Sequence, residues 1–212
     1  MSISDNIQSI KKEVPNNVTL VAVSKTKSEE EILQAYNSGH KIFGENKVQE
    51  LVEKYENLPK DIEWHMIGHL QRNKVKYIAP FVSLIHGTDS EKLLKEINKR
   101  AKQNSRIINC LLQVHIAEES TKFGFSSTEI NDIMQRSSEF ENVNIIGLMG
   151  MATFTDTISQ IEKEFCSLQQ IYKNHTSFTT LSMGMSGDYK SAIKYGSNMI
   201  RLGSIIFGNR NY

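Results

Sequence analysis

The stretch Val18-Thr-Leu-Val-Ala-Val-Ser24-Lys25 decides the fold. Residues 18–23 are apolar or β-branched without strict alternation, a pattern typical of a strand buried on both faces of a parallel sheet. The segment Ser28-Glu-Glu-Glu31 follows as a capping box, which predicts a helix over residues 29–38 that ends at Gly39. Lys25 is therefore expected at the carboxyl end of a buried strand, just before a loop into a helix.

This position suits a reactive lysine. The carboxyl ends of parallel strands are where α/β folds carry out their chemistry. A lysine whose stem lies in apolar surroundings binds its proton less tightly and can act as a nucleophilic amine. The alternative is that Lys25 and Lys27 only extend from a strand end and keep their charges in water.

Strand and helix patterns alternate along the rest of the chain. Strands are predicted at residues 18–24, 41–44, 63–68, 82–87, 106–116, 144–151, 179–183 and 199–203. A helical pattern follows each strand, and an amphipathic helix over residues 3–13 precedes the first. These patterns predict an α/β fold, a single (β/α)8 TIM barrel with an extra N-terminal helix, as one domain over residues 1–212. A doubly wound open sheet is the alternative, although it more usually has about five or six strands.

Composition excludes several function classes. The chain has 212 residues, a formal net charge of +1, 39% apolar residues and 23% charged residues, so no global field attracts it to nucleic acid or to a membrane. The basic cluster Arg72, Lys74 and Lys76 is more typical of a solvated helix face than of a nucleic-acid site. The sequence contains neither a membrane-spanning run nor a secretory signal, and its two cysteines have no metal or disulfide spacing. A cytoplasmic protein with reduced thiols is expected.

Polar residues collect where the predicted strands end. Two of the segments concerned, Ser182-Met-Gly-Met-Ser-Gly-Asp188 and Leu202-Gly-Ser-Ile-Ile-Phe-Gly208, are rich in glycine and serine and run into helices after the last two strands. Barrels commonly build phosphate sites there from backbone N–H groups and helix dipoles, although such loops also occur as plain turns. The strand-end residues are Lys25, Asn46, His65, His69, Lys122, Ser186, Arg201 and Ser204.

A ligand that carries both an aldehyde and a phosphate would use the lysine and these loops together. Pyridoxal phosphate is one such ligand, held as a Schiff base on the lysine. A Schiff-base aldolase acting on a sugar phosphate satisfies the same two features. Arg201 favours the former, because an arginine that faces a pyridine nitrogen only donates and leaves that nitrogen unprotonated. The ring is then a weak electron sink, better suited to holding than to demanding carbanion chemistry. Arg201 as an ordinary ion-paired strand residue is the alternative.

An ordered set of motifs runs through nearly the whole chain. The motifs are Val21-Ala-Val-Ser-Lys-Thr-Lys27, Phe43-Gly-Glu-Asn-Lys-Val-Gln-Glu50, Trp64-His-Met-Ile-Gly-His-Leu-Gln-Arg-Asn-Lys74, Glu119-Ser-Thr-Lys-Phe-Gly-Phe125, Gly147-Leu-Met-Gly-Met-Ala152, Leu181-Ser-Met-Gly-Met-Ser186 and Met199-Ile-Arg-Leu-Gly-Ser-Ile-Ile-Phe-Gly208. In this order they resemble the pyridoxal phosphate homeostasis proteins, single-domain fold-type III barrels similar to the N-terminal domain of alanine racemase.

The resemblance implies roles for particular residues. Lys25 would carry the cofactor, Arg201 would face its pyridine nitrogen, and Lys122 would lie near its phenolic oxygen. The phosphate would be held by Ser186, Gly203 and Ser204, and the pocket would be lined by Asn46 and Met66. Ser204 departs from the threonine that the family more usually has, which keeps the hydroxyl and loses a methyl contact.

The resemblance also implies a function without a catalytic residue. The expected protein holds pyridoxal phosphate for intracellular homeostasis, and its further partners are pyridoxal-dependent apo-enzymes or enzymes of vitamin B6 metabolism. The racemase's second domain, which supplies a catalytic tyrosine and a dimer contact, has no counterpart here, so a monomer is expected. A fold-type III enzyme such as an amino-acid racemase is the alternative, and it would need Lys122 or Tyr189 as a second proton donor.

Three remaining features have simpler interpretations. His65 and His69 are four residues apart but straddle a strand end, which disfavours a shared metal, and no metal site is predicted. Cys110 is expected to be an inert core thiol. The cluster Met149, Met151, Met183 and Met185 is expected to form core or pocket wall.

Overall fold

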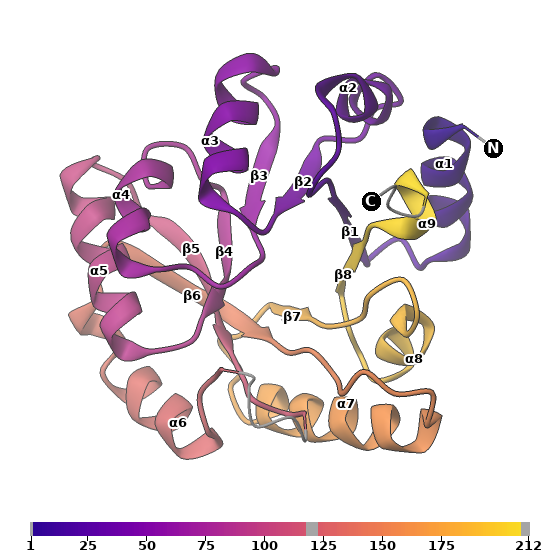
Figure 1. The fold of residues 1–212 in the computed structure, drawn as a ribbon. Coiled ribbons are helices and arrows are strands. Elements are labelled where there is room, and N and C mark those ends of the chain that lie inside the picture. Colours follow the sequence, from indigo (N-terminus) through magenta and orange to yellow (C-terminus); the bar gives the residue numbers. More distant parts are fainter. Residues whose placement is uncertain (1, 118–122, 209–212) are drawn as a thin grey trace.

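Eight parallel strands close into a barrel in the computed structural model, which describes residues 2–117 and 123–208. Each strand pairs with the next along the chain, and β1 pairs with β8 to complete the ring (Figure 1). The predicted (β/α)8 barrel is confirmed, and the open doubly wound sheet is excluded because its first and last strands would not meet. The strands are β1 (Thr19–Val23), β2 (Ile42–Glu45), β3 (Glu63–Met66), β4 (Leu84–Thr88), β5 (Ile108–Gln113), β6 (Val143–Met149), β7 (Thr180–Ser182) and β8 (Met199–Leu202).

Helices surround the ring of strands (Figure 1). The extra N-terminal helix α1 packs beside the C-terminal α9, and Asn6 Nδ2 donates to the carbonyl oxygen of Ile206 at 2.9 Å. The helices are α1 (Ile3–Glu13), α2 (Glu29–Asn37), α3 (Val48–Asn57), α4 (Val75–Ile78), α5 (Glu91–Gln103), α6 (Ser127–Gln135), α7 (Ile158–Lys173), α8 (Tyr189–Lys194) and α9 (Ser204–Phe207), with 3-10 turns η1 (Arg72–Lys74) and η2 (Ser137–Glu139).

Capping residues fix where several helices begin. Ser28 and Ser126 form the predicted capping boxes with Glu31 and Glu129, since each serine accepts from a backbone N–H and each glutamate accepts from the serine N–H. Thr157 is the N-cap residue of α7, but its side chain makes no capping hydrogen bond. The helical pattern that follows the third predicted strand covers residues 71–79, and the structure has there a 3-10 turn followed by the single turn α4.

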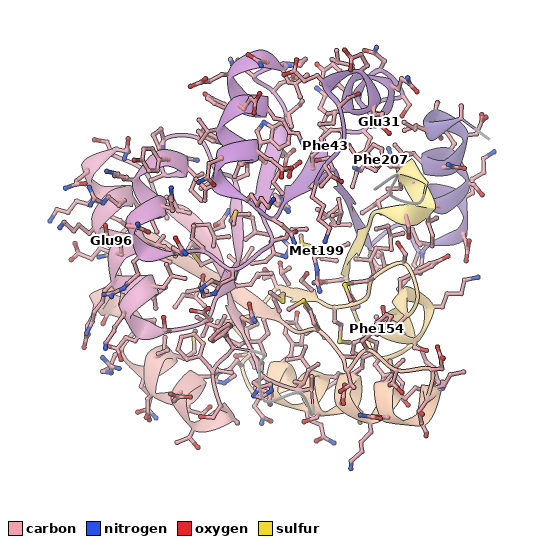
Figure 2. All side chains as sticks on the ribbon, viewed as in Figure 1. Glu31, Phe43, Glu96, Phe154, Met199 and Phe207 are labelled. Atoms are coloured by element: carbon pink, nitrogen blue, oxygen red, sulfur yellow. The ribbon has the colours of Figure 1, made fainter. Side chains whose placement is uncertain are left out.

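Alternation along the strands divides the core into two layers. Val21, Leu84, Leu111, Met149 and Met199 form a cluster inside the barrel. The neighbouring strand residues, such as Phe43 and Trp64, join a second and larger cluster between the strands and the helices. Figure 2 shows the labelled Met199 inside the ring of strands and Phe43 on its outer side. The parity of a strand residue therefore decides whether its side chain reaches the barrel interior.

None of the described helices is both long enough and apolar enough to cross a membrane. The expected core thiol is confirmed, because Cys110 is fully buried and burial raises its pKa to about 12.

Candidate functional site

The carboxyl ends of β1, β2 and β8, with the loop after β7, surround a cavity of about 450 Å³. Loops that lie far apart in sequence converge here because the parallel strands of a closed barrel end at one mouth. Six of the seven cofactor-binding residues predicted from the sequence line this cavity. They are Lys25, Asn46, Ser186, Arg201, Gly203 and Ser204.

The seventh, Met66, lies elsewhere. Met66 is fully buried and belongs to the cluster between strands and helices, together with Trp64 two residues earlier. Alternation along β3 then turns the next residue, Ile67, to the barrel interior, where it lines the cavity. The structure thus gives the apolar wall of the cavity to Ile67, Val23 and Met151.

The two glycine- and serine-rich loops are joined to each other at one side of the cavity. The Gly203 N–H donates to Ser186 Oγ at 3.3 Å, and Arg201 N donates to the carbonyl oxygen of Gly184 at 3.0 Å. Gly184 has φ +97°, and a Cβ there would lie 2.6 Å from Ala192 Cβ, so the turn requires glycine. Ser204 begins α9, and the Ile206 and Phe207 N–H groups of this single turn donate to the Gly203 carbonyl oxygen.

The Arg201 side chain lies in the barrel interior, next to the loops that follow β7 and β8. Its side chain is 4% exposed, Nη1 donates to Ser182 Oγ at 2.6 Å, and Nη2 donates to the carbonyl oxygen of Gly150 at 3.1 Å. Burial lowers the Arg201 pKa to about 10, which still leaves it protonated at neutral pH. Among the described residues, no carboxylate lies within ion-pair distance of it. The charge of Asp188 raises the Arg201 pKa without a direct contact, so Arg201 has a charge partner but no close ion pair among the described residues.

A chain of hydrogen bonds continues from Arg201 through the barrel. Ser182 Oγ lies 3.1 Å from His86 Nδ1, and His86 Nε2 lies 3.1 Å from His65 Nδ1. Burial lowers the pKa of His65 to about 3 and that of His86 well below its ordinary value, so both rings are neutral at pH 7.

The direction of donation in this chain follows from the arginine. Because guanidinium only donates, Ser182 Oγ accepts from Arg201, and we assign the serine's own hydroxyl proton to the bond with His86 Nδ1. The His86 proton is then assigned to Nε2, from which it is donated to His65 Nδ1. The two bonds to Ser182 and Gly150 engage two of the five N–H groups of Arg201 and fix its side chain.

Of the two alternative proton donors predicted from the sequence, Tyr189 is among the described residues and does not line the cavity. The Tyr189 hydroxyl donates to Glu13 Oε1 on α1 at 2.9 Å, so it offers no proton at the cavity. His65 points into the barrel, while His69 pairs with Asp89 at 2.8 Å, and no three potential ligands of a metal ion gather among the described residues. Lys122 lies outside the described residues.

The methionines behave as expected. Met149 and Met183 are fully buried, while Met151 and Met185 line the cavity. Other lining residues were missed by sequence reasoning. The alternation of β3 could have found Ile67, whereas nothing in the sequence signals Phe154, which lines the cavity and is 98% exposed (Figure 2). Lys27 also lines it, and its Nζ donates to the Phe207 carbonyl oxygen at 3.0 Å.

Comparison with known proteins decides the family. The model of the alanine racemase N-terminal domain matches residues 1–211. The pyridoxal phosphate homeostasis protein of Aquifex aeolicus is 37% identical over 203 residues, which cover 93% of this chain and 89% of that protein. The chain belongs to the pyridoxal phosphate homeostasis protein family. The family protein of Haemophilus influenzae is also 37% identical, with 93% of this chain and 87% of that protein covered.

Solved structures agree with this family membership. The structure of PipY from Synechococcus elongatus without pyridoxal phosphate has a TM-score of 0.91 and 31% identity, and it covers 98% of this chain and 100% of that one. PipY with the cofactor bound has a TM-score of 0.89 at 30% identity and the same coverage. An alanine racemase from Clostridium difficile matches at 12% identity and a TM-score of 0.81, with 57% of that chain covered, and shares the barrel fold alone.

Proposed function

We propose that this protein binds pyridoxal 5'-phosphate at the mouth of its barrel and holds it as a Schiff base on Lys25. The observation that carries the proposal is the convergence on one cavity of a lysine from the end of β1 and the hydroxyl and N–H donors of the loops after β7 and β8. When bound, the cofactor would supply an aldehyde carbon with which the Lys25 amine would condense, with loss of one water molecule. Membership of the family and the cofactor-bound PipY structure support this assignment.

The donors in the cavity fit the two polar ends of this cofactor. Ser186, the Gly203 N–H and Ser204 at the start of α9 would hold the phosphate. Arg201 would face the ring nitrogen, and Asn46 would line the pocket. When bound, the cofactor supplies an electron-withdrawing ring, and an arginine that only donates keeps that ring a weak electron sink.

We further propose that the protein serves intracellular cofactor homeostasis without robust catalysis. The names of the relatives support this role, as does the position of Tyr189, whose hydroxyl is bonded to Glu13 away from the cavity. Transfer of the cofactor to apo-enzymes is part of the same proposal. A racemase is the alternative function, and exchange of amino-acid α-hydrogens in D₂O separates the two. No exchange across a panel of amino acids is expected, and stereospecific exchange with any of them would favour the racemase.

The visible absorption spectrum tests cofactor binding directly. We expect a yellow protein whose band disappears on reduction with borohydride, with the reduced label mapped to Lys25 by peptide mass spectrometry. Lys25→Ala should lose the band, whereas Lys190→Ala, which removes a lysine paired with Glu13 outside the cavity, should keep it. A protein that stays colourless with added cofactor, and that borohydride inactivates only with a sugar phosphate present, would favour the aldolase instead.

Two further expectations from the sequence are also proposals. We propose a monomer in the cytoplasm. Light scattering after size-exclusion chromatography should give a mass near 24.2 kDa, and a mass of twice that value would overturn the monomer. Cell fractionation with a soluble marker tests the compartment.

A further inference from the structure

A cluster of charged side chains lies on the outer side of β1, between the barrel wall and α3. It consists of Glu45 at the end of β2 and of Glu50 and Lys54 on α3, and we call it the α3 clamp. Lys54 Nζ lies 2.7 Å from Glu45 Oε1 and 3.7 Å from Glu50 Oε2. Glu45 is 0% exposed and Lys54 is 6% exposed, so this ion pair has been removed from water.

The clamp holds the residue before Lys25 through two bonds. Lys54 Nζ donates to the carbonyl oxygen of Ser24 at 2.8 Å, and the Ser24 hydroxyl donates to Glu45 Oε1 at 2.6 Å. Ser24 is itself fully buried. Both its main chain and its side chain are therefore tied to charged groups, and hydrogen bonds to charged groups are among the stronger ones in proteins.

The clamp also holds the residue after Lys25. Glu50 Oε2 accepts from the Thr26 N–H at 2.9 Å. Thr26 has φ +64°, in the left-handed region that a β-branched residue rarely adopts. Such a conformation persists only where the surroundings enforce it. The carboxylate of Glu50 provides one such contact, directly at the amide of the strained residue.

The contacts of the α3 clamp lie on both sides of Lys25. Ser24 and Thr26 bond the clamp on the outer side of the barrel wall, whereas Lys25 between them lines the cavity. A buried ion pair is weak evidence for stability, because apolar side chains of similar volume often do as well. The position of the clamp residues is better explained by their hydrogen bonds to the backbone on each side of Lys25.

We infer that the α3 clamp is a positioning device for Lys25. The clamp fixes the main chain at Ser24 and Thr26. The main chain at Lys25 is therefore held in one conformation, which directs the side chain into the cavity. The clamp residues do not line the cavity and are not catalytic. The inference rests on the proposed function insofar as the positioned amine is the one that binds the cofactor.

The decisive variant is Glu50→Ala, because Glu50 is only half-buried and its loss removes the Thr26 contact without opening the core. Glu53→Ala is the matched control, since Glu53 is an exposed glutamate on the same helix. Amide hydrogen exchange of the peptide containing Thr26 should quicken by about tenfold in Glu50→Ala, as expected for a lost hydrogen bond to a charged group. Glu53→Ala should exchange as the wild type does.

Cofactor attachment is the second readout. The absorption band after mixing with pyridoxal phosphate should grow about tenfold more slowly in Glu50→Ala, while Glu50→Gln, whose amide oxygen still accepts from Thr26, should recover most of the rate. If Glu50 only stabilised the fold, Glu50→Ala would slow attachment by lowering the thermal unfolding midpoint. Slower attachment with an unchanged unfolding midpoint, and a restored rate in Glu50→Gln, would therefore indicate positioning. Equal attachment rates and equal exchange in Glu50→Ala and the wild type would overturn the inference.

The buried half of the clamp is tested by a paired change. Lys54→Met alone leaves Glu45 buried without its cation, so Glu45→Gln/Lys54→Met is used to keep the site neutral. The rate at which N-acetoxysuccinimide acetylates Lys25 is measured by mass spectrometry in the cofactor-free proteins. This rate should differ by at least about threefold between the double variant and the wild type. If the wild type never binds the cofactor, the proposed function fails, and exchange at Thr26 and acetylation of Lys25 still decide whether the clamp positions the lysine.

Discussion

The guanidinium of Arg201 is a buried cation whose hydrogen bonds among the described residues go to a hydroxyl and a carbonyl oxygen. Ser182 is central to this arrangement, because its Oγ accepts from Arg201 and contacts His86 Nδ1. Ser182→Ala should therefore lower the free energy of unfolding by about 1–3 kcal/mol, since it leaves two buried polar groups unsatisfied. Urea titration at pH 7 measures the change.

The control for this prediction is Ser167→Ala on α7, where the serine is exposed and the expected change is within about 0.5 kcal/mol. A Ser182→Ala protein as stable as the control variant would show that water replaces the hydroxyl in the chain. The direction of donation inferred for His86 and His65 would then need to be reassigned.

Buried histidines predict how stability depends on pH. Burial lowers the pKa of His40 to about 4 and that of His65 to about 3. The unfolded chain binds protons at these residues below pH 6.5 and the native barrel does not, so stability is lost as pH falls from 6.5. Between pH 6.5 and 5 each histidine costs up to about 2 kcal/mol.

His40 allows a clean measurement because it lies at the amino end of β2 and bonds the Ile42 carbonyl oxygen, away from the cavity. Urea unfolding at pH 7 and pH 5 should show that His40→Gln loses about 2 kcal/mol less than the wild type over this interval. Parallel pH dependences of the two proteins would mean that His40 is protonated in the native state.

At the scale of elements, the contact between β6 and β7 depends on one glycine. Gly147 pairs with Thr180, and a Cβ at position 147 would lie 1.7 Å from the Thr180 carbonyl oxygen. Gly147→Ala must push the two strands apart and should cost about 3 kcal/mol or more. Gly187→Ala is the control, because nothing lies within 4 Å of a Cβ there. Thermal unfolding followed by circular dichroism compares them, and equal midpoints would contradict the rigid β6–β7 contact.

The strands were predicted well because burial leaves a strong signal. Each apolar run in the sequence became a strand within a few residues of its expected position. Short elements were predicted less well. The helix expected over residues 71–79 buries only Val75, Ile78 and Ala79, and Pro80 prevents its extension, so a single α turn forms. The helix expected from Ser186 begins at Tyr189, because Asp188 Oδ1 first accepts from the Met185 N–H in a turn.

The residues that line the cavity were predictable from the strand ends, whereas the hydrogen bonds that hold Arg201 in place were not. Lys25 and Asn46 follow strands and Arg201 lies one residue before the end of β8, so the barrel topology alone brings them together. The chain from Arg201 through Ser182 to His86 depends on how β4, β7 and β8 are staggered inside the closed ring. Strand-by-strand patterns carry no information on that stagger. Met66 is a different case, because the alternation along β3 that turns Ile67 inward places Met66 on the outer side of the barrel.

At the scale of the whole molecule, the cavity straddles the place where the chain closes on itself. β1 and β8 pair through Thr19 and Met199 to Ala22 and Leu202, and α1 packs on α9 beside them. Lys25 comes from the first strand, while Ser186 and Gly203 come from the last two units. A ligand bonded to both sides therefore joins the two ends of the barrel.

We propose that residues 1–212 unfold as one domain, and ligand binding at this seam tests it. Trp64, the single tryptophan, is 1% exposed on β3, which β2 separates from β1 at the seam. If the barrel is one cooperative unit, pyridoxal phosphate should raise the unfolding midpoint reported by Trp64 fluorescence as much as that reported by far-ultraviolet circular dichroism. The added stability should be about 2.7 kcal/mol at a free concentration one hundred times the dissociation constant. Lys25→Ala should lose most of this shift in both signals. A shift seen by circular dichroism and absent from Trp64 fluorescence would instead mean that the β3 side of the barrel unfolds separately from the seam, and that the chain contains two folding units.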